Sequence, residues 1–286
     1  MAVYTFMLRP GKNLKKFGEW AVVTGATDGI GEAMAIEMAK KGMSIVLISR
    51  TESKLKDTQT KILEKYPEVG VEYISIDYSN FDGKAQEKVK KCLATKDVGI
   101  LLNNVGVSYS FARYFHELTA EEVDNMVELN VNSTTRMTHL VLPGMLERKR
   151  GSIINVSSAA ARNPSPLLAE YAGSKGFVEH FSESMYHELK GKGIHVQVQS
   201  PLFVVSKLSK IRKSSLSTPK PSAYAKAAVA HIGYQAKVSP YWAHALQLWV
   251  VRNIPEWVFI GMIAMPMHLS IRKRGYKKLE REAKAE

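Results

Sequence analysis

The sequence has a single cysteine, Cys92, among its 286 residues. One thiol excludes an internal disulfide and a cluster of thiolate metal ligands, so we expect a reducing compartment such as the cytosol and no bound metal. The chain also lacks any recognisable helix-turn-helix, zinc-finger or RNA-binding signature, and its basic residues are spread along its length. These absences exclude nucleic acid as a favoured partner.

Runs of uncharged residues long enough to cross a bilayer are also missing. The few residues before Arg9 are too short to span and have no basic region of a signal peptide. Residues 257–271 carry no charge, but Pro266 interrupts them and the basic stretch RKRGYKK follows. Two interpretations remain open for this segment. It packs on the core, over a pocket or in a homo-oligomer contact, or it anchors the protein at a membrane surface, where its basic flank meets anionic lipid.

Positive charge is abundant, with 40 Lys and Arg against 27 Asp and Glu and a formal net charge of +13. This excess favours anionic partners, such as a phosphorylated cofactor, a coenzyme A ester or a membrane surface. Hydrophobic residues make up 45% of the chain, which is ample for a buried core. We therefore expect a globular protein.

Short apolar runs alternate with longer segments of helical periodicity. The apolar runs are WAVVTGA, SIVLISR, VEYISID, GILLNNVG, GSIINVSS and IHVQVQSP. Because these runs are apolar at nearly every position, as buried parallel strands are, the pattern predicts an α/β fold of the Rossmann type. The expected structure is a doubly wound parallel sheet of about seven strands, flanked by helices.

The alternation of apolar runs and helical segments is interrupted between Pro201 and about Val238, where Ser, Pro and Lys are frequent. We interpret residues 202–237 as an insertion over the sheet edge, because the rest of the chain after Val238 is too short to form its own core. The sequence thus predicts an N-terminal segment over 1–18, one domain over 19–250 that includes the insertion, and an apolar then basic extension over 251–286.

A glycine-rich turn, TGATDGIG, comes directly after the first predicted strand. Gly25 permits a tight turn, Gly29 lets the backbone approach a pyrophosphate, and Gly31 lets the next helix pack closely, with its N-terminus facing the anion. Strand, turn and helix in this order predict a dinucleotide site. Its candidate residues in the turn are Thr24, Gly25, Asp28, Gly29, Ile30 and Gly31.

The next two strands end in residues that bear on the choice of dinucleotide. Arg50 stands where an NAD enzyme would place a carboxylate, and a cation there favours the 2′-phosphate of NADPH or NADP+. Glu52 competes for this position, although we interpret it as a carboxylate in the first turn of a helix. Asp77 has two open interpretations, an acceptor for the adenine amino group and a helix cap.

Tyr171 and Lys175, in the stretch EYAGSK, are four residues apart and thus neighbours on one helix face. Ser158 precedes Tyr171 by thirteen residues, and Asn130 lies in an earlier predicted helix. Together with TGATDGIG and NNVG, this ordered set resembles the short-chain dehydrogenase/reductase family over residues 19–206.

The resemblance implies roles for the matching residues. Tyr171 is expected to donate its proton to a substrate carbonyl as hydride arrives from the nicotinamide. Lys175 is expected to lower the pKa of that phenol and to hold the nicotinamide ribose. Ser158 would orient the substrate oxygen, and Asn130 would hold a water that passes protons to Lys175. Ser157, one position off the spacing, should face the other side of the strand.

Two further positions complete the cofactor site that the resemblance implies. Asn104, in NNVG, and Val204, by its position only, are expected near the cofactor. The chain departs from the family pattern at Leu202, where many members have glycine after the proline, so the backbone course there stays open.

The stretches SPLFVVSKLSK and YWAHALQLWVVRNIPEW are similar to a narrower group, the microsomal very-long-chain 3-oxoacyl-CoA reductases and their 17-beta-hydroxysteroid dehydrogenase relatives. This similarity implies a location at the endoplasmic reticulum membrane, facing the cytosol. The first residues would then be the remnant of a membrane anchor. If the anchor is absent, a cytoplasmic protein is expected.

These features lead to three hypotheses of function. The first is NADPH-dependent reduction of a long-chain 3-oxoacyl-CoA in fatty-acid elongation, with Lys207 near the coenzyme A phosphates and Phe203 near the acyl chain. The second is reduction of a 17-oxosteroid or another lipophilic carbonyl compound, which needs no phosphate-binding cations. The third is a nucleotide-binding scaffold of a membrane complex without catalysis.

Overall fold

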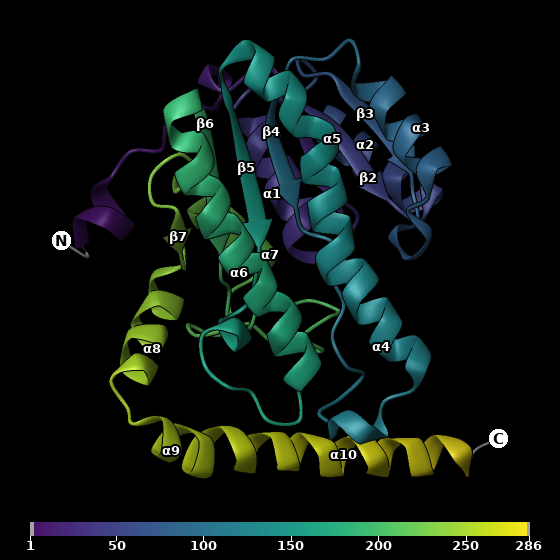
Figure 1. Cartoon of the computed structure of the whole chain (residues 1–286), viewed down its shortest axis with the longest axis vertical. Coiled ribbons are helices and arrows are strands. Elements are labelled where there is room, and N and C mark those ends of the chain that lie inside the picture. Colours follow the sequence, from purple (N-terminus) through teal and green to yellow (C-terminus); the bar gives the residue numbers. More distant parts are fainter. Residues whose placement is uncertain (1–2, 285–286) are drawn as a thin grey trace.

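The computed structural model describes residues 3–284, so the outermost two residues of the predicted N-terminal segment and of the C-terminal extension lie outside the described residues. Its centre is one parallel sheet of seven strands (Figure 1). The strands are β1 (Trp20–Thr24), β2 (Ser44–Ser49), β3 (Val71–Ser75), β4 (Val98–Asn103), β5 (Gly151–Val156), β6 (Ile194–Gln199) and β7 (Lys237–Val238).

The strand order in the sheet is β3-β2-β1-β4-β5-β6-β7, and every neighbouring pair is parallel. In register, Val22 of β1 faces Val46 of β2 and Leu101 of β4. The order reverses between β1 and β4, and ligands of such sheets bind in the crevice beyond the carboxyl ends of the strands at this switch point. The fold therefore directs attention to the loops after β1 and β4.

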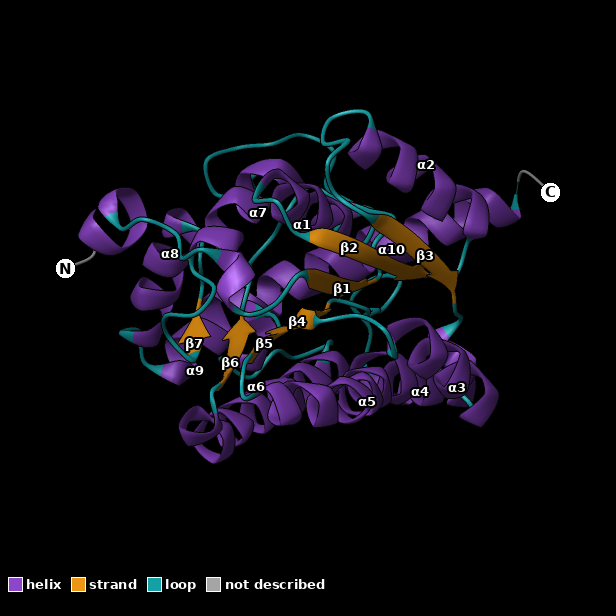
Figure 2. Cartoon of the chain, turned by 90° about the horizontal axis from the view of Figure 1, so that it is seen from above, coloured by secondary structure: helices purple, strands orange, loops and turns teal. Residues whose placement is uncertain are grey.

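Helices cover both faces of the sheet (Figure 2). They are α1 (Gly29–Lys40), α2 (Glu52–Leu63), α3 (Gly83–Leu93), α4 (Ala120–Val127), α5 (Ser133–Arg148), α6 (Ala169–Leu189), α7 (Pro221–Ala230), α8 (Trp242–Arg252), α9 (Glu256–Val258) and α10 (Met265–Ala283). The doubly wound arrangement predicted from the sequence is confirmed.

Two hydrophobic cores lie on the two faces of the sheet. Ala21 and Val23 of β1 pack in the core beneath α1, α2 and α7, whereas Val22 packs in the core beneath α3, α5 and α6. Successive side chains of a strand point to opposite faces, and here both faces are covered, so each position of the strand needs an apolar residue. This is why the apolar runs predicted the strands.

The predicted insertion is only partly irregular. Residues 202–220 form no long helix or strand, but α7 begins at Pro221 and buries Tyr224, Ala225 and Ala228 against the core. The expectation of an insertion over the sheet edge is therefore wrong for its second half, because α7 packs on the sheet face beside α1. The domain boundaries themselves stay a prediction.

The C-terminal helix, which we define as Glu256–Ala283, joins α9, a π-helical turn (Phe259–Ala264) and α10 in one run. It crosses the end of the molecule toward which β5 points (Figure 1). Among the described helices, none is long and apolar enough by itself to cross a membrane; α8 and the C-terminal helix together satisfy that length and composition test, but they meet at a bend of 111°.

Candidate active site

The glycine turn between β1 and α1 lies at the switch point of the sheet. Gly25 and Gly29 have positive φ angles of 63° and 55°, which glycine adopts without strain. A Cβ at Gly31 would lie 2.2 Å from the Gly25 carbonyl oxygen and 2.4 Å from Asn104 Nδ2. The turn and the start of α1 therefore accept no side chain at this point.

Asn104, directly after β4, holds the turn in place. Its Nδ2 donates to the carbonyl oxygens of Thr24 and Gly25, both at 3.2 Å, and its backbone N donates to Thr24 Oγ1 at 3.0 Å. Ile30 packs partly buried against the core in the first turn of α1. The backbone N–H groups of α1 then face the crevice, as a pyrophosphate site requires.

Asp28 is the residue before α1, but its side chain accepts no capping hydrogen bond. Its carboxylate instead lies 3.1 Å from Lys207 Nζ of the segment after β6. In the same region, a Cβ at Gly29 would lie 3.4 Å from Ser206 Cβ. The segment that contains Lys207 thus lies directly over the glycine turn.

Arg50 and Glu52 lie where β2 ends and α2 begins, the region in which the adenine end of the cofactor is expected. Arg50 comes directly after β2, and its carbonyl oxygen accepts from Ser75 Oγ at 2.8 Å. Glu52 begins α2 and pairs with Lys56 at 3.0 Å, which agrees with its interpretation as a first-turn carboxylate. Arg50 is therefore the cation nearest in sequence to the end of β2.

Asp77 lies two residues beyond the end of β3 rather than on the strand. Its Oδ1 accepts from Ser79 N at 3.0 Å and from Ser79 Oγ at 2.8 Å. Of the two interpretations, the helix cap is thus observed for one carboxylate oxygen. Contact with an adenine stays a prediction for the other.

Tyr171 and Lys175 lie on α6, and Ser158 lies two residues beyond the end of β5. The Ser158 side chain interacts with the Tyr171 phenol and opposes the effect of burial on the pKa of that phenol. Lys175 is 5% exposed, and its Nζ donates to the Val156 carbonyl at 3.1 Å. The structure thus brings the phenol, the hydroxyl and the ammonium together at the carboxyl end of β5.

Asn130 lies in a π-helical turn (Glu128–Asn132) between α4 and α5, and is fully buried. Its Oδ1 accepts from Val107 N at 2.8 Å, and its Nδ2 donates to Ser174 Oγ at 2.9 Å. A single π turn inside a helix often marks a functional site. Here it places a side-chain amide between the loop after β4 and α6.

Gly106 separates Asn130 from Lys175, and the sequence pattern alone gave it no role. A Cβ at this position would lie 2.9 Å from Asn130 Oδ1 and 2.9 Å from Lys175 Nζ. Only glycine therefore leaves the space between these two polar groups open. Gly106 is the last residue of the NNVG motif, so the motif included it. The need for glycine there becomes visible only in the fold, which brings the loop after β4, the π-helical turn and α6 together.

Burial dominates the electrostatics of the site. It lowers the pKa of the Lys175 ammonium to about 8. It also raises the pKa of the Tyr171 phenol above its usual value, and the hydrogen bond from Ser158 offsets this only in part. The expected lowering of the Tyr171 pKa is thus not produced by the protein groups alone, because the effect of burial exceeds that of Ser158.

The remaining predicted positions lie beside these groups or in the segment after β6. Ser157 is buried and donates to the Lys175 carbonyl at 2.8 Å, so it faces away from Ser158 and supports α6. Leu202 has no left-handed backbone angle, so a side chain is accommodated where glycine is common. Val204 is buried in the core, and Phe203 beside it is 48% exposed.

A glycine-rich turn at the switch point and a half-buried phenol beside a buried ammonium are the features of a dinucleotide-dependent oxidoreductase with a doubly wound fold. The chain belongs to the short-chain dehydrogenase family, whose model matches residues 19–216.

Curated relatives match almost the whole chain. A very-long-chain 3-oxoacyl-CoA reductase of Macaca fascicularis is 43% identical over 92% of this chain and 84% of its own length. A very-long-chain 3-oxoacyl-CoA reductase of Laccaria bicolor is 42% identical over 98% of this chain and 86% of its own length.

Solved structures share the fold. A 7beta-hydroxysteroid dehydrogenase superposes with a TM-score of 0.77 and 24% identity, covering 87% of this chain and 98% of that one. A short-chain dehydrogenase of Sphingobium yanoikuyae in complex with NADPH gives a TM-score of 0.68 and 22% identity, covering 83% and 96%.

Proposed function

We propose that the protein reduces a long-chain 3-oxoacyl-CoA to the 3-hydroxyacyl-CoA with NADPH, as a step of fatty-acid elongation. The observation that carries the proposal is the Tyr171 phenol, with Ser158 acting on it, beside the buried Lys175. Relatives that are 42–43% identical and named very-long-chain 3-oxoacyl-CoA reductases support this substrate class.

The residues of the site fit the proposed cofactor. The glycine turn, with Gly25 and Gly29 at positive φ, and the start of α1 suit a pyrophosphate. Arg50 after β2 suits a 2′-phosphate, which supports NADPH over NADH. When bound, NADPH supplies the hydride.

In the proposed reaction, the Tyr171 hydroxyl donates its proton to the substrate carbonyl oxygen, and the Ser158 hydroxyl orients that oxygen. Because burial raises the pKa of Tyr171, the phenol is protonated at neutral pH, as an acid for reduction must be. The buried phenolate left behind must then regain a proton. In this proposal Lys175, whose pKa is about 8, supplies it, and Asn130 supports a path to solvent.

Residues of the segment after β6 would flank the substrate. Phe203, 48% exposed, and Leu208, 51% exposed, offer apolar surface for an acyl chain. Lys207, paired with Asp28, is proposed to hold this segment over the cofactor turn. The same apolar surface would suit a steroid, which is the alternative substrate class.

The test is steady-state oxidation of NADPH and NADH against 3-oxoacyl-CoA thioesters of increasing chain length and against a 17-oxosteroid. We expect kcat/KM to be highest for NADPH with a long 3-oxoacyl-CoA. A 17-oxosteroid turned over as fast would overturn the assignment. A nucleotide-saturated protein that is inert toward every carbonyl compound would favour the scaffold hypothesis.

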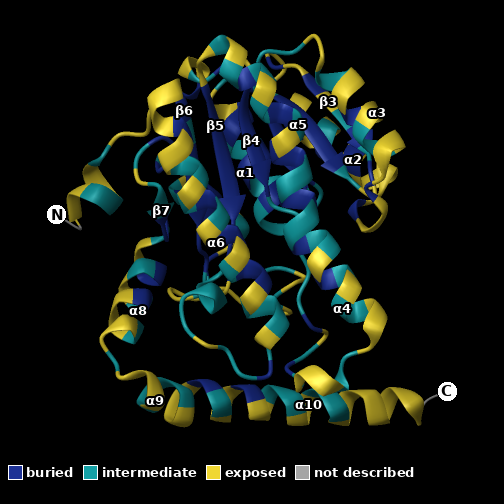
Figure 3. Cartoon of the chain, in the orientation of Figure 1, coloured by how far each residue is buried: buried dark blue, intermediate teal, exposed yellow. Residues whose placement is uncertain are grey.

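We also propose that the protein associates with an anionic membrane surface, in agreement with a location at the endoplasmic reticulum. Trp257 and Met262 of the C-terminal helix are 75% and 73% exposed. Exposed positions recur along the C-terminal helix (Figure 3), and Lys277 and Lys278 in its second half are exposed. Exposed aromatic and apolar side chains beside cations are typical of a helix that lies in a membrane interface.

A further inference from the structure

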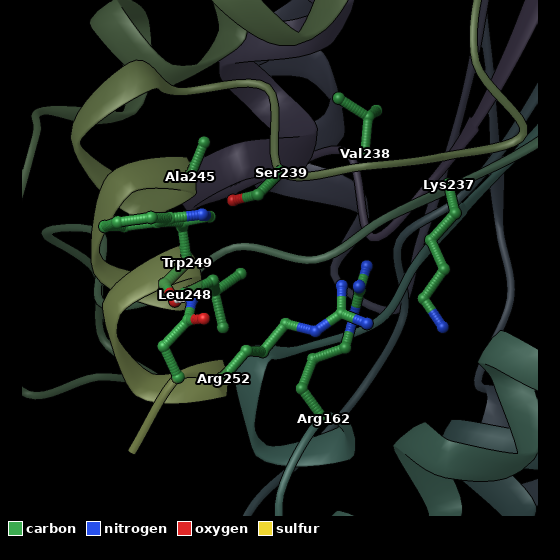
Figure 4. Close-up of a pocket in the computed structure, with 9 residues that line it drawn as sticks. Arg162, Lys237, Val238, Ser239, Ala245, Leu248, Trp249 and Arg252 are labelled. Atoms are coloured by element: carbon green, nitrogen blue, oxygen red, sulfur yellow. Dashed lines mark hydrogen bonds between the residues drawn. The ribbon is translucent and has the colours of Figure 1, made fainter.

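A pocket of about 400 Å³ lies between α8, β7 and the loop after β5 (Figure 4). Arg162, Lys237 and Arg252 extend into it from these three elements, and Trp249 of α8 forms part of its wall. The volume is within the range of small-molecule sites. None of the proposed steps of the reduction uses this pocket.

The charges in the pocket are not balanced. Arg162 Nε lies 2.6 Å from Glu179 Oε1, and Lys237 Nζ lies 2.7 Å from Glu179 Oε2. Lys237 also pairs with Glu183 at 3.0 Å. Within residues 3–284, no carboxylate lies within ion-pair distance of Arg252. Two carboxylates therefore face three cations, and the guanidinium of Arg252 carries the excess positive charge.

Two uncharged groups of the same pocket are also suited to a ligand. Ser239 is only 8% exposed, and its hydroxyl has no hydrogen-bond partner among the described residues. A buried hydroxyl without a partner is unfavourable, so it favours a ligand that offers an acceptor or donor. The indole of Trp249 is 64% exposed and is available for stacking against a planar ring.

The pocket is near the reducing centre along the chain. Ser158 caps the short helix Ala159–Ala161, and Arg162 comes directly after that helix. On α6, Glu179 lies one helical turn after Lys175. Arg162 in the pocket wall and its ion-pair partner Glu179 thus follow Ser158 and Lys175 on the same two elements.

We propose that this pocket binds the phosphorylated nucleotide of coenzyme A, with phosphate on Arg252 and Arg162 and the adenine ring on Trp249. The inference rests on the proposed function for the source of that nucleotide, which is the thioester substrate itself. Free coenzyme A has the same chemistry, and the experiment separates the two sources. An extended anion with a planar base matches the guanidinium groups, the hydroxyl and the indole together.

The test compares two thioesters of one 3-oxoacyl chain, the coenzyme A ester and the N-acetylcysteamine ester, which has neither phosphate nor nucleotide. In Arg252→Gln we expect KM for the coenzyme A ester to rise about tenfold, the loss expected for one charge-assisted contact. KM for the N-acetylcysteamine ester should not change. Lys226→Gln, which removes an exposed cation from α7, is the control for net charge and should change neither KM.

An equal change for both esters in Arg252→Gln, or no change for either, would overturn the proposal for the substrate. Calorimetric titration of free coenzyme A into wild type and Arg252→Gln is the second measurement. Binding lost in the variant, with both KM values unchanged, would overturn the substrate as the source and identify free coenzyme A instead. If wild type reduces neither ester, the proposed function fails, whereas the titration still decides whether the pocket binds the nucleotide.

Discussion

Lys175 is a buried cation whose pKa lies close to the physiological range. Burial places this pKa at about 8, so the residue is an ammonium below that pH and neutral above it. The ammonium is the form that can return a proton to the Tyr171 phenolate. We therefore expect kcat of the reduction to fall as the pH rises through about 8. Tyr171 is not expected to cause this fall, because burial raises its pKa.

The matched variant for this pH profile is Lys175→Arg. A guanidinium stays charged far above neutral pH, so the falling limb should move to higher pH even if kcat itself is lower. If kcat falls at the same pH in both proteins, the group whose ionisation causes the fall is not residue 175.

Gly106 is a second residue whose identity is decided by its neighbours. In Gly106→Ala the new methyl group would lie 2.9 Å from both Asn130 Oδ1 and Lys175 Nζ. We expect a loss of about 1–3 kcal/mol in the free energy of unfolding, because the site is overpacked. We also expect kcat to fall by about 100-fold through displacement of Lys175. Urea unfolding and steady-state kinetics measure the two effects.

Gly173 on α6 provides the control, since it is exposed and a Cβ there would meet no atom within 4 Å. Gly173→Ala should keep kcat and raise the free energy of unfolding by about 0.5–1 kcal/mol, the usual gain of alanine over glycine in a helix. Equal kinetics in both alanine variants would show that the space at Gly106 has no role in catalysis.

Among the elements, the C-terminal helix is attached through its inner face to the rest of the protein. Arg272 forms a two-pronged ion pair with Glu117 in the loop after β4, and His268 is hydrogen-bonded through Nδ1 to the Pro166 carbonyl at 2.7 Å. The Tyr276 ring packs edge-on against Phe111 at 5.0 Å. The helix therefore contacts both loops that lead to the reducing centre.

In Arg272→Gln the ion pair with Glu117 is lost, and the loop after β4 is expected to open more often. Hydrogen exchange should become faster in residues 104–119 and 265–283, and KM for a long acyl chain should rise more than kcat falls. Lys273→Gln, which removes an exposed cation from the same helix, is the control. Unchanged exchange in residues 104–119 would contradict the coupling of helix and loop.

An element could be predicted from the sequence where its local pattern of apolar residues was clear. β1 and β4 were predicted because both faces of the sheet are covered and every position is apolar. α7 was missed because Pro and Ser at its start, and Lys within it, mask four buried residues at helical spacing. The contact of Arg272 with Glu117 joins residues far apart in sequence, so no local pattern could predict it.

The candidate site shows the same division. Ser158, Tyr171 and Lys175 belong to a motif with fixed spacing, and their positions in the fold agree with that order. The raised pKa of Tyr171 could not be predicted from the sequence, since it results from the burial of the phenol in the folded chain. Arg162 and Arg252 lie in unrelated stretches of sequence, and only the fold brings both to one pocket.

At the scale of the whole molecule, the proposed membrane association depends on the outer surface of the C-terminal helix. The intact protein should sediment with vesicles of anionic lipid, and less so at high salt, because its cations are exposed. Trp257→Asp together with Met262→Asp should reduce the bound fraction strongly, since these side chains point to solvent. Centrifugation of the vesicles measures this fraction.

Leu63→Asp, which places the same charge at an exposed apolar position of α2, should leave vesicle binding intact. A wild-type protein that never binds vesicles but forms a concentration-dependent dimer, broken by the double variant, would assign the surface to contact between copies of the chain.

The segment after β6 touches both sides of the crevice. Lys207 pairs with Asp28 at the glycine turn, and the Lys210 ammonium donates to the Ser110 carbonyl in the loop after β4. These two contacts tie the segment across the crevice, so its opening and not bond-breaking is expected to limit turnover. NADPH deuterated at the transferred position should then give an isotope effect on kcat close to one, and Lys207→Gln should make the isotope effect larger by releasing the segment.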